Sequence, residues 1–332
     1  MKTAVIGSGA WGTALGMVLH QNGHSVTLWS YLEDESRNLA ETLENPFLPQ
    51  VQLPEDFEFT SNIECIKGKE LIVFATPSFA VRETAKKAAP FLDENTVIVS
   101  VTKGIELDTG MCMSEIISQE TGKTVVALSG PSHAEEVSRG IPTGVVAACE
   151  NKELAQIVHD AFTTDRFRVY ISPDVTGVEL GAALKNIIAL CAGVSDGMGY
   201  GDNTKALLMT RGLEETARLG LALGASRETF AGLSGIGDLI VTCTSMHSRN
   251  RRAGILIGKG MKAEEAMKQV GAVVEGYYAI ASALSLAEKV NVEMPITMAA
   301  YDVIYNGKDL LVVAEDLMNR RNTSENDLTV WR

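Results

Sequence analysis

The sequence predicts a doubly wound, mostly parallel α/β sheet in the first part of the chain and an all-helical second part. Two observations predict this division. Up to about residue 172, short apolar runs of strand length alternate with helical segments, which is typical of βαβ units. After Pro173, apolar residues recur at helical spacing behind capping residues. We therefore expect a first domain over residues 1–172 and a helical domain over residues 173–332.

The first element is expected to be a buried strand at residues 3–6, and a glycine-rich turn follows it directly. Gly7, Gly9 and Gly12 have the spacing of a dinucleotide-binding turn, with Ala10 and Trp11 between them. Such glycines give a tight turn, close approach of the backbone to a pyrophosphate, and close packing of the next helix. The alternative is a merely structural turn.

The flanking residues favour the dinucleotide site. A helix is expected over residues 13–21, Asn22 and Gly23 end it, and residues 25–29 form the second strand of a βαβ unit. We therefore expect a Rossmann-like domain to begin here.

Further buried strands and helices follow in alternation. Both faces of the strands are apolar, so each strand should be covered on both sides. Strands are expected at residues 71–75, 96–101, 124–128, 144–148 and 167–170, with helices at 80–89 and 111–120. In the second part, helices should begin near Asp174, Asp202, Pro295 and Asp309.

The composition excludes several classes of function. The chain has 332 residues, 45% hydrophobic residues and a net charge of −13, which disfavours nucleic acid or an anionic membrane as partner. No uninterrupted apolar stretch approaches membrane-spanning length. Gly7 and Gly9 interrupt the first apolar run too early for a signal peptide. We expect a cytoplasmic protein, partly disordered over the polar residues 319–332.

No metal site or disulfide framework is expected. The five cysteines are widely spaced, with no C-x-x-C pair, which suits reduced thiols. His20 and His24 have the spacing of a metal pair on a helix, but Asn22 and Gly23 should end the helix between them.

Three charged residues stand in places that suit catalysis. Lys185 interrupts a strongly apolar helix at residues 180–190, and a buried lysine has a lowered pKa and can exchange protons near neutrality. Lys103 directly follows a predicted strand, at the edge where open α/β sheets bind ligands. Asp238 lies in an apolar, glycine-rich stretch. Each residue also has a structural interpretation: Lys185 could snorkel to the surface, Lys103 could be an ordinary surface lysine, and Asp238 could be a helix N-cap.

Two further segments suit an anionic ligand. Residues 129–132 follow a strand with small side chains and free N–H groups, although they could be a plain turn. Residues 248–252 place three arginines within four positions of an acidic protein, and guanidinium groups at a helix start bind phosphate. The alternative is a solvated charged face.

Together these residues resemble the NAD(P)-dependent glycerol-3-phosphate dehydrogenases of the bacterial type. The resemblance spans almost the whole chain. It rests on the blocks Gly7-Ser8-Gly9-Ala10-Trp11-Gly12-Thr13-Ala14, Ala75-Thr76-Pro77-Ser78, Thr102-Lys103-Gly104-Ile105-Glu106, Ser129-Gly130-Pro131-Ser132, Leu184-Lys185-Asn186, Gly201-Asp202-Asn203-Thr204-Lys205, Gly235-Ile236-Gly237-Asp238-Leu239, Thr242-Cys243-Thr244-Ser245, Ser248-Arg249-Asn250 and Val274-Glu275-Gly276.

The resemblance implies a reaction and a set of roles. The enzyme would reduce dihydroxyacetone phosphate to sn-glycerol 3-phosphate for glycerophospholipid synthesis, as a homodimer. Lys185 would be the general acid and base, supported by Lys103 and Asp238. The substrate would contact Lys103, Gly130, Ser132, Lys185, Asp238, Ser248, Arg249 and Asn250. The cofactor would contact Gly7, Gly9, Ala10, Trp11, Gly12, Tyr31, Lys103, Ala134, Arg249, Val273 and Glu275. Lys205 and Thr242 would also lie near the site.

The choice between NAD and NADP stays open. Many members of the family place an arginine or histidine after the second strand, suited to the adenosine 2′-phosphate, whereas this chain has Tyr31 there and no basic residue before Arg37. Glu33 could bind a ribose 2′-hydroxyl, which favours NAD, or simply open a helix.

Two other functions are compatible with parts of the pattern. A related dehydrogenase acting on a 3-hydroxy acid would share the two-domain plan and a helical lysine, but it has less need of the cluster at residues 248–250. A non-catalytic dinucleotide sensor would keep the glycine turn without Lys185. The presence of Lys103, Lys185 and Asp238 together argues against a sensor.

Overall fold

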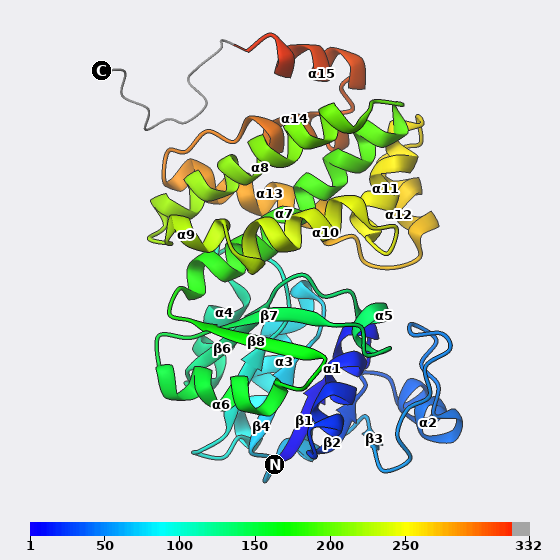
Figure 1. The fold of residues 1–332 in the computed structure, drawn as a ribbon, viewed down its shortest axis with the longest axis vertical. Helices are drawn as coiled ribbons and strands as arrows, with labels where there is room; N and C mark the ends of the chain where they lie inside the picture. Colours follow the sequence, from blue (N-terminus) through cyan, green and yellow to red (C-terminus); the bar gives the residue numbers. More distant parts are fainter. Residues whose placement is uncertain (321–332) are drawn as a thin grey trace.

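The computed structural model describes residues 1–320 and places an eight-stranded sheet beside a bundle of helices (Figure 1). The strand order is β3-β2-β1-β4-β5-β6-β7-β8. Neighbouring strands are parallel except β6 and β7, which are antiparallel. The prediction of a mostly parallel, doubly wound sheet is confirmed. Apart from residues 319 and 320, the predicted disordered tail lies outside the described residues.

The predicted strands are present, with ends that differ by one or two residues. An additional short strand, β3, extends the sheet beyond β2. The strands are β1 (Lys2–Ile6), β2 (Ser25–Trp29), β3 (Glu58–Thr60), β4 (Leu71–Phe74), β5 (Val97–Ser100), β6 (Val125–Ser129), β7 (Thr143–Ala148) and β8 (Phe167–Ser172).

Helices cover both faces of the sheet, as the apolar strands require. α1 (Ala10–Gln21) and α6 (Lys152–Phe162) contribute buried side chains to the apolar cluster on one face. α3 (Val81–Ala88) and α4 (Met113–Thr121) contribute to the cluster on the other. Two further helices, α2 (Glu33–Thr42) and α5 (Ala134–Val137), follow β2 and β6.

The order of the strands reverses at β1: β2 and β3 lie on one side of it, and β4 and the later strands lie on the other. In such sheets, ligands bind at the carboxyl ends of the strands next to this reversal. The glycine-rich turn after β1 lies at this point, so the topology places it where a dinucleotide would bind.

The second part is helical, as predicted, and residues 173–320 contain no strand. The Asp174 carboxylate accepts a hydrogen bond from the Gly177 N–H at 2.8 Å and so caps the first helix. Pro295 and Asp309 also stand at helix starts. The helices are α7 (Val175–Gly197), α8 (Asp202–Ala222), α9 (Arg227–Phe230), α10 (Asp238–Thr244), α11 (Arg249–Gly258), α12 (Ala263–Val270), α13 (Glu275–Lys289), α14 (Pro295–Ile304) and α15 (Leu310–Met318).

α7 is the central helix of this part, and α11 crosses it at very short distance. A Cβ atom on Gly193 of α7 would lie 2.2 Å from the carbonyl oxygen of Arg251, and one on Gly254 of α11 would lie 2.1 Å from that of Leu190. Only glycine permits this approach. The contact fixes the start of α11 relative to the middle of α7.

α7 is an apolar helix, but Glu179 and Lys185 interrupt its apolar run, so it agrees with the expectation that no uninterrupted apolar stretch in the described residues approaches membrane-spanning length. It is long and apolar enough, by those two criteria, to cross a membrane, and 89% of its most apolar window is buried within the protein. The surrounding helices account for this apolar composition.

The five cysteines form no disulfide, and His20 and His24 have separate partners. All five cysteines lie within residues 1–320, and each is free. His20 pairs with Asp56, whereas His24 contacts the amino terminus. The described residues contain no group of three or more His, Cys, Asp or Glu side chains that could hold a metal ion.

Candidate active site

Lys185, Asp238 and Lys103 form one buried ionic cluster at the junction of the two parts. One carboxylate oxygen of Asp238 accepts a hydrogen bond from the Lys185 ammonium, and the other accepts one from Lys103 Nζ at 2.9 Å. The Lys185 and Asp238 side chains are 7% and 1% exposed, and that of Lys103 is 20% exposed. The three residues come from α7, the start of α10 and the loop after β5.

Thr242 completes the surroundings of Lys185. Its hydroxyl accepts a hydrogen bond from Lys185 Nζ at 2.7 Å and donates one to the backbone carbonyl of Asp238 at 2.6 Å. An ammonium carries three donors, and two of those of Lys185 are used by side chains of the described chain. The remaining donor can serve a substrate oxygen.

The surroundings lower the pKa values of both Lys185 and Asp238. Burial lowers the pKa of Lys185 to about 7, and the nearby charge of Lys103 adds to this, against the attraction of Asp238. Burial alone would raise the pKa of Asp238, but the charges of Lys103 and Lys185 outweigh it and hold that pKa below its usual value. Lys185 can therefore exchange a proton near neutrality while Asp238 stays ionised.

The structure excludes the alternatives given above for Lys185 and Asp238. Lys185 does not snorkel to the surface, because its ammonium ends inside the protein on Asp238. Asp238 is not a side-chain N-cap. It follows a short π-helical turn at residues Leu233–Gly237 and is the first residue of α10, and its carboxylate points to the lysines. Such turns are frequent at functional sites.

The loop after β6 approaches the cluster with small residues. A Cβ atom on Gly130 would lie 2.9 Å from the Cα of Val145, so this position has no room for a side chain. The Ser132 hydroxyl donates a hydrogen bond to the Gly130 carbonyl at 2.9 Å. Ala134 is buried at the first position of α5. His133 lies between these residues, and burial lowers its pKa, with the Lys185 charge contributing.

At the start of α11, residues 248–250 present one cation and turn their other two polar side chains inward. The Arg249 side chain is exposed and makes no ion pair with residues 1–320. Ser248 caps the helix by accepting the Arg251 N–H. The Asn250 amide is buried: it donates to Asn186 Oδ1 at 2.9 Å and accepts from the Gly276 N–H at 2.8 Å. Arg249 is thus the side chain of this segment that is free to reach an anion.

Glu275 connects the helical part to the sheet part beside the cluster. It is the first residue of α13, and it accepts a hydrogen bond from the Ser78 hydroxyl at 2.7 Å. The pKa of Glu275 is raised, because burial outweighs the hydrogen bonds from Ser78 and the charge of Arg249, which lower it. Val273, a partly buried residue two positions earlier, precedes α13. Ser78 follows β4, so this contact lies near the glycine-rich turn.

The three glycines of the turn meet three different needs. Gly7 has φ +122°, and a Cβ there would lie 2.7 Å from the Ala75 carbonyl oxygen. A Cβ on Gly12 would lie 2.0 Å from the Gly7 carbonyl oxygen, whereas nothing lies within 4 Å of one on Gly9. Gly9 is the N-cap of α1, and no side chain caps it there. The fold therefore needs glycine at positions 7 and 12, whereas Gly9 leaves room for a ligand.

Unpartnered polar atoms around this turn fit a bound dinucleotide. Trp11 Nε1, Ser30 Oγ and Thr76 Oγ1 are buried and have no hydrogen-bond partner among the described residues. Buried polar groups without partners are uncommon in folded proteins. They follow β1, β2 and β4, the strands at which the sheet reverses, so the donor set suits a ligand at this edge. Ala10 begins α1 between Gly9 and Trp11.

The end of β2 presents both signs of charge. Tyr31 is 71% exposed, and Lys87 Nζ lies 5.6 Å from the centre of its ring. Glu33 is exposed and is the first residue of α2, so it does open a helix, as one of its two interpretations predicts. Arg37 pairs with Asp34.

Lys205 lies in a different cluster. Its Nζ contacts Asp196 Oδ1 at 2.8 Å, and the other oxygen of Asp196 binds Arg251 at 2.8 Å. The structure therefore joins Thr242 to Lys185 but gives Lys205 another partner.

Three residues of this region were not among the predicted site residues. Ser78, Asn186 and His133 contact or adjoin predicted residues. Ser78 and Asn186 belong to sequence blocks that carry the family resemblance, and His133 stands between the predicted residues Ser132 and Ala134. These positions in the sequence point to the three residues.

Two family models and several named proteins match most of this chain. Residues 2–155 match the family model described as NAD-dependent glycerol-3-phosphate dehydrogenase N-terminus, and residues 174–315 match the corresponding C-terminus model. Two relatives are named glycerol-3-phosphate dehydrogenase with NAD(P)+. The one from Pelotomaculum thermopropionicum is 51% identical over 98% of this chain and 95% of its own length. The one from Fusobacterium nucleatum is 49% identical over 96% of this chain and 97% of its own.

A solved structure supports the whole fold. The crystal structure of glycerol-3-phosphate dehydrogenase from Coxiella burnetii superimposes with a TM-score of 0.92 at 36% sequence identity. The superposition covers 96% of this chain and 99% of that one.

Proposed function

Because this chain belongs to the NAD-dependent glycerol-3-phosphate dehydrogenase family, we propose that Lys185 is the proton donor and acceptor of its reaction. The enzyme transfers a hydride between NAD(P)H and dihydroxyacetone phosphate, and the product is sn-glycerol 3-phosphate. Both parts of the chain match this one family, so a 3-hydroxy-acid dehydrogenase and a non-catalytic sensor are set aside.

The ionic cluster of Lys185, Asp238 and Lys103 is the main support for the proposed role of Lys185 in proton transfer. When bound, the nicotinamide supplies or accepts the hydride. As the carbonyl carbon gains the hydride, the carbonyl oxygen gains negative charge and needs a proton. The Lys185 ammonium stabilises that charge and gives the proton, leaving a neutral amine that solvent protonates again. In the reverse direction, the neutral amine takes the proton from the hydroxyl.

Asp238 and Lys103 hold Lys185 in place for this step. Asp238 stays charged between the two lysines and fixes the Lys185 ammonium by a hydrogen bond. Two ammonium groups and one carboxylate leave a local excess of one positive charge, in a chain of net charge −13. This excess suits an anionic substrate.

Arg249 is proposed to bind the substrate phosphate, because it is the exposed cation at the start of α11. Gly130, Ser132 and Ser248 would line the same pocket. The buried amide of Asn250 would act mainly by fixing this segment, since Asn186 and Gly276 already hold it. Binding of the remote phosphate would keep the carbonyl close to Lys185.

The cofactor is proposed to bind at the carboxyl ends of β1, β2 and β4. Gly7, Gly9 and Gly12 allow the backbone to approach a pyrophosphate, and the start of α1 offers its N–H groups. Beyond this turn, the proposed cofactor contacts are Ala10, Trp11, Tyr31, Lys103, Ala134, Arg249, Val273 and Glu275.

The remaining proposals rest on the resemblance, on the fold and on the composition. We place the domain boundary at residues 172 and 173, between β8 and α7. A homodimer and a supply of product to glycerophospholipid synthesis are proposed from the resemblance alone. A cytoplasmic location is proposed from the sequence composition. Light scattering of the purified protein tests the dimer directly.

The first experiment measures nicotinamide oxidation with dihydroxyacetone phosphate, separately with NADH and NADPH. Unphosphorylated dihydroxyacetone is the control. Turnover that requires the phosphate supports the proposed substrate pocket. Equal turnover with both substrates contradicts a phosphate-binding role for Arg249, and the ratio of the two cofactors gives the preference that Tyr31 and Glu33 leave open.

A further inference from the structure

The loop that carries Lys103 connects the two parts of the molecule. It runs from the end of β5 to the start of α4, and it closes on itself through a backbone bridge between Ile105 and Cys112. The side chains of these two residues are buried in the apolar cluster of the helical part, with residues such as Leu184 and Leu286. Lys103 thus stands two positions before an anchor in the helical part.

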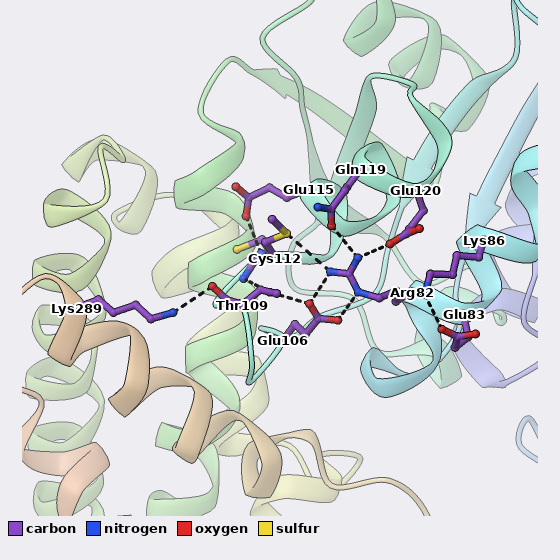
Figure 2. Close-up of polar contacts among 11 residues, drawn as sticks. Arg82, Glu83, Lys86, Glu106, Thr109, Cys112, Glu115, Gln119, Glu120 and Lys289 are labelled. Atoms are coloured by element: carbon purple, nitrogen blue, oxygen red, sulfur yellow. Dashed lines mark hydrogen bonds and ion pairs between the residues drawn. The ribbon is translucent and has the colours of Figure 1, made fainter.

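On its other side, this loop is held by Arg82 of α3. Figure 2 shows the Arg82 guanidinium between Glu106 of the loop and the end of α4. Its Nε and one terminal nitrogen donate to the two carboxylate oxygens of Glu106 at 2.8 and 2.6 Å. The other terminal nitrogen donates to Gln119 at 2.7 Å and pairs with Glu120.

A two-pronged contact of this kind fixes direction as well as distance. The Arg82 and Glu106 side chains are only 22% and 23% exposed, so solvent weakens the pair less than it weakens a surface ion pair. The hydrogen bond from Arg82 is the largest influence on Glu106 and lowers the pKa of this carboxyl group. The pair therefore stays charged at neutral pH.

Glu106 passes this constraint to the rest of the loop. Its carboxylate also accepts the Thr109 hydroxyl at 2.7 Å, and its N–H donates to the Met111 carbonyl at 2.9 Å. Lys289 at the end of α13 donates to the Thr109 carbonyl at 3.2 Å. The turn of the loop is thereby fastened to both α3 and α13 (Figure 2).

We propose that Arg82, acting through Glu106, is a positioning residue that holds Lys103 against Asp238. Arg82 itself lies in the layer of α3 and α4 and makes no contact with the ionic cluster. Glu106 is three positions from Lys103, on the loop that Ile105 anchors in the helical part. Releasing Glu106 lets the loop shift relative to α10, and Lys103 loses its fixed 2.9 Å contact with Asp238. The inference rests on the proposed function of Lys103 and Asp238.

A double-mutant cycle tests this coupling. The variants are Arg82→Gln, Lys103→Ala and the combination, assayed for kcat and KM with dihydroxyacetone phosphate. We expect Arg82→Gln to lower kcat by about 10- to 100-fold, because small misplacements of catalytic groups have effects of this size. The KM for the nicotinamide cofactor should change much less than kcat does, because Lys103 is only one of the proposed cofactor contacts. In the Lys103→Ala background, the same substitution should change kcat by less than about twofold, because a shared pathway makes effects non-additive.

Two further variants separate positioning from a general loss of stability. Arg82→Lys keeps the charge but not the fork, so it should recover part of the lost kcat. Lys86→Gln removes a lysine of the same helix that pairs with Glu83 at the surface, at 3.0 Å, and should leave kcat within about twofold. Thermal unfolding of each variant shows whether it is folded. If Arg82→Gln does not fold, the cycle is run with Arg82→Lys.

Each outcome decides a separate point. Equal losses on Arg82→Gln in both backgrounds overturn the coupling but leave the role of Lys103 intact, provided that Lys103→Ala alone is impaired. Normal turnover of Lys103→Ala contradicts the proposed function of Lys103 and overturns the inference with it. A loss that appears only in cofactor KM also overturns the inference.

Discussion

The ammonium of Lys185 and the carboxylate of Asp238 form an ion pair inside the protein, where both side chains are almost completely shielded from solvent. Lys103 occupies the second oxygen of the same carboxylate. Because the carboxylate is shared, removal of either lysine leaves Asp238 with one partner, so the consequences for folding and for chemistry can be measured separately.

Substitution of Lys185 tests the proton transfer. Lys185→Met keeps an unbranched, apolar side chain in the core but removes the ammonium, and Asp238 keeps Lys103. We expect kcat to fall by about 10²- to 10⁴-fold, the usual contribution of a positioned acid. Fluorescence titration should show unchanged binding of the reduced cofactor. Near-normal turnover would rule out Lys185 as the proton donor.

The pH dependence should have opposite signs in the two directions. Reduction needs the protonated ammonium, so its kcat/KM should fall as pH rises through about 7, the value to which burial lowers the Lys185 pKa. Oxidation needs the neutral amine, so its kcat/KM should rise over the same interval. Initial rates measured in both directions from about pH 5.5 to about pH 9 test this prediction. This range extends roughly two units on either side of neutrality. Parallel profiles in the two directions would exclude Lys185 as their common cause.

Arg249→Ala tests the binding of phosphate. Arg249 is exposed and makes no ion pair with residues 1–320, so loss of its guanidinium should preserve the fold; Glu275 loses one nearby positive charge but keeps the hydrogen bond from Ser78. We expect KM for dihydroxyacetone phosphate to rise by about 10- to 100-fold, the effect of a charged hydrogen bond. Lys259→Ala, at the exposed opposite end of α11, is the matched control for loss of one positive charge. An unchanged KM in Arg249→Ala would identify the segment as a solvated charged face.

Gly9 and Gly12 should respond differently to the same added methyl group. Gly12→Ala places Cβ against the Gly7 carbonyl and should lower the melting temperature. Gly9→Ala meets no protein atom within 4 Å, so the melting temperature should stay near that of the parent protein while the cofactor Kd rises. Calorimetry and fluorescence titration of the two variants measure these quantities. Retained cofactor affinity in Gly9→Ala would place the pyrophosphate away from this turn.

The sequence predicts the elements well because their signals are local. The glycine turn, the apolar strands and the cap at Asp174 each depend on residues a few positions apart, and each is present. Lys185 could be selected for a similar reason, since one charge in an apolar helix requires a partner or a function.

The partners themselves could not be predicted from local pattern. Lys103 and Asp238 are 135 positions apart, and Ser78 and Glu275 are 197 apart, so their contacts exist only after the two parts pack together. The same holds for Asn250: its neighbours in sequence suggested phosphate binding, but the close crossing of α7 and α11 turns its amide toward Asn186.

The buried carboxylate of Glu179 should make the stability of the protein depend on pH. Glu179 lies on α7, and one of its oxygens accepts the Ser114 N–H at the start of α4 at 2.9 Å, while the Ser114 hydroxyl contacts the other. Burial raises its pKa to about 7, against hydrogen bonds from Ser114 that lower it. In the unfolded chain the group titrates near the ordinary value of about 4.3.

Between these two pKa values the folded protein binds more protons than the unfolded chain, so the free energy of unfolding falls as pH rises. Glu179→Gln keeps one acceptor for the Ser114 N–H and removes the charge. Relative to the parent protein, its unfolding free energy should therefore increase from pH 5 to pH 8 by up to roughly 3 kcal/mol. Urea unfolding of both proteins at the two pH values measures the difference. A difference that stays constant with pH would mean that Glu179 titrates alike in the folded and unfolded states.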